Sequence, residues 1–187
     1  MEQIMNYVDG QIDYSNRLRY ILVQIIELLP EVNELDIQFQ IKSDLEFSSW
    51  FEFYSKQGLF KAGLQLSDGT IINEDPIFDL TIMVKQLYQY FEMCNIQEHE
   101  LFLAKWIFVT IHELGHICNF YTFKYVYSQV EKVNTRHRQG MDKIINKSDP
   151  ITNMISYFSS ATELQADQYA YRYFPYIWNN LKQRGLI

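Results

Sequence analysis

The sequence predicts an α+β fold with an N-terminal helix, a small and mostly antiparallel sheet, and a helical second half. Three observations predict this class: apolar residues recur with helical spacing over 14–29, alternate over 35–42, and regain helical spacing from residue 79 onward. The chain has 187 residues, 48% of them hydrophobic, and shows no internal repeat. We therefore expect one domain over 1–187, divided into a helix within 1–30, a sheet within 35–73 and a helical part over 79–175.

The first two parts are predicted from short local patterns. The helix over 14–29 is expected to end at Pro30, because proline cannot continue a helical hydrogen-bond pattern. Strands are expected over 35–42, 47–54, 59–66 and 70–73. The last two flank Asp68 and Gly69, a pair typical of tight hairpin turns, which predicts an antiparallel hairpin.

The helical part begins at Asp79, a good N-cap residue. Helices are expected over 79–94, from about residue 97 to 121, and over 122–133. The polar stretch 134–150 predicts a loop or lid over the site. Pro150 then begins a further helix that runs to about Phe174 and is expected to end at Pro175.

Composition excludes several classes of protein. With 16 basic and 23 acidic residues the formal charge is −7, which argues against a general nucleic-acid-binding surface. Two cysteines make no disulfide framework. No secretory signal is expected, and the apolar stretch from Leu101 to Ile111 predicts a buried helix, too short to cross a membrane. We therefore expect a cytoplasmic protein with no membrane partner.

The chemistry-bearing motif is His112-Glu113-Leu114-Gly115-His116. Residues i and i+4 of a helix share one face, so two imidazoles at this spacing can bind one Zn²⁺ ion. Glu113 lies beside that face, where it can act on water as a general base and then as a general acid. The alternative is a helix with two structural histidines and no metal.

A catalytic zinc ion needs a third protein ligand. His99 lies 13 residues before His112, about 20 Å along a helix, which excludes it. Glu163 is the better candidate, and Asp167 lies one turn further on. We expect Glu163 to bind zinc and Asp167 to accept a hydrogen bond from a zinc-binding histidine, since such partners orient the ring. The alternative is an ordinary solvated acidic pair.

The order H-E-x-x-H and then E-x-x-x-D resembles the gluzincin metallopeptidases. The segment from Glu163 to Ala170 is similar to a block found in small ImmA/IrrE-type peptidases. The resemblance covers about residues 75–175, and residues 122–150 look inserted. It implies a zincin-like core: a twisted sheet, an active-site helix and a glutamate helix. It also implies that an edge of the sheet near 59–73 binds an extended substrate strand.

Peptide hydrolysis also needs a donor for the developing oxyanion. The sequence offers His137, in the polar loop, as well as Tyr157 and Tyr171, and it does not choose between them. For His137, a surface histidine between two arginines is the competing interpretation.

Together these patterns predict a zinc-dependent peptidase that hydrolyses a peptide bond in a specific protein or peptide, with a regulatory protein as a candidate substrate. The alternative hypothesis is a regulatory protein-binding module that keeps the fold and cleaves little or nothing. The sequence does not name the substrate.

Overall fold

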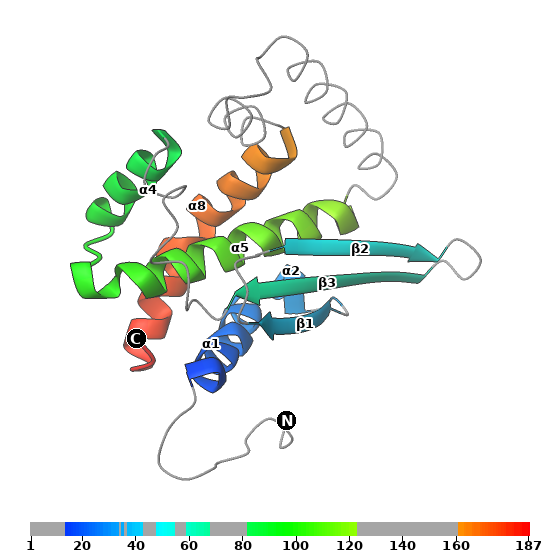
Figure 1. Cartoon of the computed structure of the whole chain (residues 1–187), viewed down its shortest axis with the longest axis horizontal. Coiled ribbons are helices and arrows are strands. Elements are labelled where there is room, and N and C mark those ends of the chain that lie inside the picture. Colours follow the sequence, from blue (N-terminus) through cyan, green and yellow to red (C-terminus); the bar gives the residue numbers. More distant parts are fainter. Residues whose placement is uncertain are drawn as a thin grey trace.

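The structure is a computed structural model of the whole chain, and it describes residues 14–33, 35, 37–42, 48–54, 59–67, 82–122 and 161–187. The described residues form a mixed but helix-dominated fold (Figure 1). In chain order its elements are α1 (Tyr14–Glu27), α2 (Pro30–Asn33), β1 (Ile37–Lys42), β2 (Ser48–Tyr54), β3 (Leu59–Ser67), α4 (Ile82–Met93), the 3-10 helix η1 (Glu98–Glu100), α5 (Leu101–Thr122) and α8 (Ala161–Gln183).

The predicted N-terminal helix is confirmed as α1. One face of it is buried in the core through Leu18, Ile21, Leu22 and Ile25, as the helical spacing of these residues requires. Pro30 begins the short α2 helix, where its missing N–H group and fixed φ angle are tolerated.

Three of the four predicted strands are confirmed, but the strand directions are not. The sheet has the order β1-β3-β2, in which β3 pairs in parallel with β1 and antiparallel with β2. The expectation of a mostly antiparallel sheet was therefore wrong. The register pairs Phe39 with Leu64 and Ile41 with Leu66, so apolar residues of β1 and β3 share one face. Side-chain alternation selects that face and contains no information on strand direction.

The predicted hairpin at Asp68 and Gly69 lies outside the described residues, as does the strand expected over 70–73. The antiparallel pair that the structure does describe joins β2 and β3, which are separated in sequence by residues 55–58. The helix expected over 122–133 and the loop over 134–150 also lie outside the described residues.

Helix α5 is the centre of the described fold. It lies beside β2, β3 and α8 (Figure 1) and contacts all three. The residues buried along it include Trp106, Ile107 and Ile111. The segment Glu98–Thr122 is 25 residues long, and its most apolar 18-residue window has a mean hydropathy of 1.3. By length and composition alone it could therefore cross a membrane, contrary to the expectation from Leu101 to Ile111. Because 67% of its most apolar window is buried inside the protein, α5 has the packing of a core helix.

Helix α8 continues eight residues beyond Pro175, so the prediction that this proline ends the helix was wrong. A proline at this position has no N–H group to donate to the carbonyl oxygen of Tyr171, four residues earlier. The hydroxyl of Tyr90 on α4 donates to that oxygen instead, at 2.9 Å. Beyond the proline, Trp178 and Leu181 are buried in the core, which favours continuation of the helix.

Candidate metal centre

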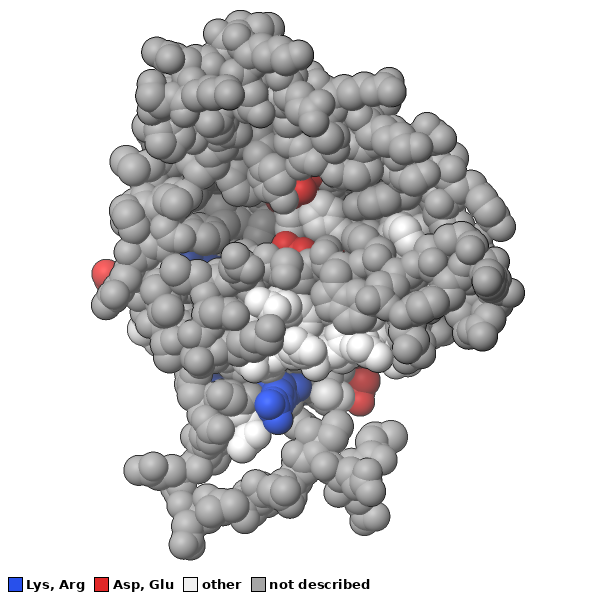
Figure 2. Space-filling view, turned by 45° about the vertical axis from the view of Figure 1, so that its right-hand side comes forward, with Lys and Arg blue, Asp and Glu red and all other residues white. Residues whose placement is uncertain are grey.

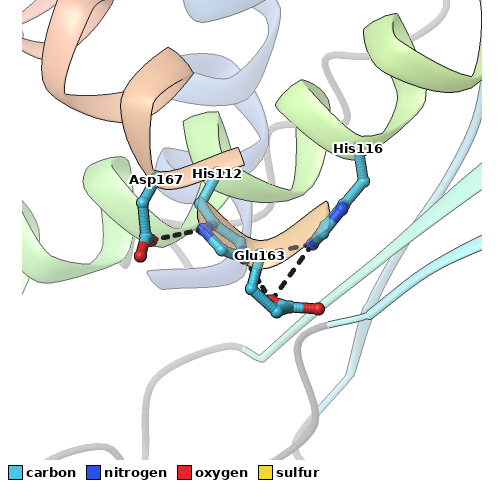
Figure 3. A network of polar contacts seen from close by, with 4 residues as sticks. All are labelled: His112, His116, Glu163 and Asp167. Carbon is cyan, nitrogen blue, oxygen red and sulfur yellow. Dashed lines mark hydrogen bonds and ion pairs between the residues drawn. The ribbon is translucent and has the colours of Figure 1, made fainter. Parts of the chain in front are cut away.

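The two histidines of the H-E-x-x-H motif lie one turn apart on α5 and point the same way (Figure 3). Their Nε2 atoms are 3.2 Å apart, and the residues are only 8% and 7% exposed for His112 and His116. The helical spacing predicted that the rings share a face, and the structure confirms it. Two imidazole nitrogens are therefore aimed at one buried point.

Glu163 brings a carboxylate to the same point from α8, although 47 residues separate it from His116. Its Oε2 atom lies 3.3 Å from Nε2 of His112 and 3.4 Å from Nε2 of His116. The three atoms form a nearly equilateral triangle. Ligand atoms at 2.0–2.1 Å from a tetrahedral ion are about 3.3–3.4 Å apart, so this donor set matches one face of such a tetrahedron.

Glu113 adds a second carboxylate to the cluster. His112, Glu113 and His116 each offer one ligand atom, and these three atoms lie within 4.8 Å of one another. Such a group could hold a metal ion. The described part of the chain thus brings two carboxylates and two imidazoles together.

Asp167 lies behind the first histidine, one helical turn after Glu163. Its Oδ1 atom is 2.8 Å from Nδ1 of His112. Figure 3 marks this contact with a dashed line. A carboxylate only accepts, so Nδ1 of the ring donates, and the neutral ring then keeps its lone pair on Nε2. This is the tautomer that a metal ion requires, with the lone pair facing Glu163 and His116.

The electrostatics of the cluster favour positive charge between the carboxylates. Burial by itself lowers the pKa of His112, but hydrogen bonds to Asp167 and Glu163 and the charge of Glu113 outweigh it and raise that pKa. Burial by itself raises the pKa of Glu163, but hydrogen bonds from both histidines outweigh it and lower that pKa. A proton satisfies this preference in the metal-free protein, and a divalent cation satisfies it better because it binds all three ligand atoms.

The second histidine lacks the support that the first one has. Nδ1 of His116 is buried, and within the described residues it has no hydrogen-bond partner. The two imidazoles are therefore not equivalent: Asp167 contacts Nδ1 of His112, whereas His116 meets the cluster only through the Nε2 contacts described above, as far as the described residues show.

Of the remaining predicted site residues the structure describes Tyr171, and burial together with the charge of Asp167 raises its pKa. Tyr171 packs edge-on against the rings of Tyr90 and Phe108, with centroid distances of 4.8 and 4.9 Å, so it belongs to an aromatic cluster between α4, α5 and α8. His137 and Tyr157 lie outside the described residues. The oxyanion donor stays a prediction.

Sequence reasoning missed Gly115, which lies between the two histidines on α5 and faces α8. The available signal was the pairing of this glycine with the small residue Ala166 near Asp167. Small residues on both helices allow their backbones to approach closely.

Figure 2 shows acidic side chains of the described residues near the centre of the view, and basic side chains below them beside a further acidic group.

Searches of protein families, of curated proteins and of solved structures found no match to this chain. The geometry of the cluster and the H-E-x-x-H motif therefore carry the functional argument.

Proposed function

We propose that this protein is a zinc-dependent peptidase of the gluzincin type, with His112, His116 and Glu163 as the metal ligands. The observation that carries the proposal is the triangle of ligand atoms with sides of 3.2, 3.3 and 3.4 Å. Two imidazoles and one carboxylate are a known ligand set of catalytic zinc, which leaves a position open for water or substrate. This set also distinguishes the site from structural zinc sites, which are closed and rich in cysteine.

Each residue has a distinct task in this proposal. Bound zinc would supply Lewis acidity, polarising the peptide carbonyl and lowering the pKa of water. Glu113 takes a proton from the attacking water and delivers it to the leaving amine. Asp167 holds the ring of His112 in the required tautomer through the 2.8 Å hydrogen bond.

The substrate we propose is a protein or peptide, and the compartment is the cytoplasm. Cys94 and Cys118, the free cysteines of the described residues, fit a reducing compartment. In gluzincins a sheet edge binds the substrate strand. The expectation that this edge lies near 59–73 was wrong for β3, because β3 lies between β1 and β2. We propose β2 for this role, since it is an edge strand that contacts α5.

Metal content is the first test. Protein purified without added zinc and then incubated with it is expected to hold about one equivalent by elemental analysis. Glu163→Gln is expected to weaken zinc binding, while Glu92→Gln, which changes an exposed glutamate on α4, is expected to leave it unchanged. Uptake of less than about a tenth of an equivalent by the wild type would defeat the metal assignment.

Proteolysis is the second test, with a peptide library made from digested cytoplasmic proteins as the probe. New peptide termini found by mass spectrometry are expected with the zinc-loaded wild type and not with Glu113→Gln, which keeps the three ligands. If both proteins hold zinc and yield the same peptides, the enzyme assignment is wrong and the binding-module hypothesis replaces it.

A further inference from the structure

Helices α5 and α8 pack closely against each other at Gly115. A Cβ atom placed on this residue would lie 3.0 Å from Cβ of Tyr169, 3.2 Å from Cδ1 of Tyr169 and 3.2 Å from Cα of Ala166. Ordinary carbon contacts begin at about 3.5 Å. Even one methyl group at this position therefore overlaps the facing helix.

The overlap cannot be relieved by rotating a side chain. Cα of Ala166 belongs to the backbone, and Cβ of Tyr169 is fixed to the backbone by one bond. At least one of the two helices must therefore move by a few tenths of an ångström if residue 115 gains a side chain.

The tyrosine ring that covers Gly115 is also held at its outer end. The hydroxyl of Tyr169 donates to Oε1 of Glu31 on α2 at 2.9 Å, and Sγ of Cys118 lies 3.6 Å from the same hydroxyl. The ring thus lies between the glycine and α2, with polar contacts that keep it there. Displacing α8 would strain or break these contacts.

The same two helices carry the whole candidate metal centre. The hydrogen bond from His112 to Asp167 crosses between α5 and α8, as do both contacts of Glu163 with the histidines. A separation of a few tenths of an ångström would lengthen all three distances together. Ligand geometry tolerates little such change, because metal–ligand distances are fixed to within about 0.2 Å.

We propose that Gly115 is a positioning residue of the metal centre: by allowing Tyr169 and Ala166 to touch the backbone of α5, it sets the distance at which Glu163 and Asp167 meet the two histidines. The inference rests on the proposed metal binding and not on peptidase activity. Gly115 has no side chain to offer a ligand atom, so its role in this proposal is exerted through the packing of α5 against α8.

The test is the zinc affinity of Gly115→Ala, measured by competition with a chromophoric chelator. Affinity is expected to fall by about 10–100-fold, the range seen when groups supporting a ligand are lost. Alanine is the better helix former, so α5 by itself gains from this change. The loss would therefore report the contact between the helices.

A matched control separates positioning from general destabilisation. Ala104→Val overpacks a fully buried site on α5, eight residues before His112. It is expected to lower the melting temperature while changing zinc affinity less than about 3-fold, because distant sites act independently. The visible spectrum of bound Co²⁺ gives a second measurement: Gly115→Ala is expected to shift or weaken the four-coordinate absorption, and Ala104→Val is not.

The Tyr169→Gly background keeps the inference testable if Gly115→Ala alone does not fold. This change removes both of the Tyr169 atoms in question and leaves the 3.2 Å approach to Cα of Ala166. Adding Gly115→Ala in that background is therefore expected to lower zinc affinity by less than about 10-fold. A 10-fold or larger further loss in that background would overturn the inference. So would wild-type affinity in Gly115→Ala alone.

Failure of the proposed function is distinguishable from failure of this inference. If the wild type binds neither zinc nor Co²⁺, the metal assignment fails and the positioning role fails with it. If the wild type binds zinc but cleaves no peptide, the positioning role of Gly115 is still decided by the affinities.

Discussion

The hydroxyl of Tyr90 is expected to stabilise α8 at the point where Pro175 interrupts its hydrogen bonds. Tyr90→Phe removes this hydroxyl and keeps the ring, so the edge-on contact with Tyr171 at 4.8 Å and the contact with Phe174 at 5.9 Å persist. The change leaves no cavity beyond one oxygen atom. Its main effect is on the carbonyl oxygen of Tyr171, which loses its donor.

The expected loss of stability in Tyr90→Phe follows from the burial of the hydrogen bond to Tyr171. A buried acceptor without a partner costs about 1–3 kcal/mol, and this bond is partly buried, which places the cost near the lower end, about 1–1.5 kcal/mol. For a chain of 187 residues, the melting temperature is then expected to fall by about 2–6 °C. On the metal-free protein, urea unfolding followed by circular dichroism measures the free energy, and thermal unfolding followed in the same way measures the melting temperature.

A double-mutant cycle with Pro175→Ala tests the reasoning itself. Alanine restores an N–H group that can donate to Tyr171, so Tyr90→Phe is expected to cost less than about 0.5 kcal/mol in that background. Tyr176→Phe, which alters an exposed tyrosine of the same helix, serves as the control and is expected to change stability by less than about 0.5 kcal/mol. If Tyr90→Phe costs the same with Pro175 and with alanine, the hydroxyl does not compensate for the proline and the explanation is refuted.

Three further predictions concern the metal centre and an ion pair that joins η1, just before α5, to the end of α8. Asp167→Asn is expected to weaken zinc binding by about 10–100-fold in a chelator competition, and unchanged affinity would show that this carboxylate does not support His112. Removing zinc with a chelator is expected to lower stability by about 2.7 kcal/mol relative to protein with free zinc at 100 times the dissociation constant, seen as a lower melting temperature; equal melting temperatures would contradict it. Glu100 Oε1 lies 2.7 Å from Lys182 Nζ, and although burial raises the pKa of Glu100, the N–H of Gln97 and the lysine lower it overall. Because the pKa is lowered, the ion pair stabilises the fold fully above the ordinary value of 4.5, and this stabilisation is lost as pH falls from 4.5 through the lowered pKa. Glu100→Gln should therefore cost about 0.5–1 kcal/mol near neutral pH and progressively less as pH falls below 4.5; a pH-independent cost would contradict the assignment.

The sequence predicted the parts of the site that depend on one helix at a time. The spacing of His112 and His116 places their rings on one face wherever the helix lies, and the same holds for Glu163 and Asp167. The existence of α1 and of three strands followed in the same way from the period of the apolar residues. These features depend on backbone geometry, which is local and is therefore readable from short stretches of sequence.

Local patterns contained no information about the direction of strand pairing or about the hydrogen bond that compensates for Pro175. The alternation of Ile37, Phe39 and Ile41 is equally compatible with a parallel and an antiparallel neighbour, so the parallel pairing of β1 with β3 could not be predicted. In sequence, Pro175 predicts the end of a helix. In the structure the hydroxyl of Tyr90, 85 residues before Pro175, donates the hydrogen bond to the carbonyl oxygen of Tyr171 that the proline cannot donate.

What the sequence by itself determined is the chemical content of the candidate site: two imidazoles at one spacing, two carboxylates at another, and a glutamate between the histidines. What only the tertiary structure decided is the distance between the two helices, on which the 3.3 and 3.4 Å contacts of Glu163 depend. That distance is set by packing between residues far apart in the chain, above all where Gly115 meets Tyr169. Side-chain volumes at such contacts act only after the helices have come together, and for that reason no local pattern contains them.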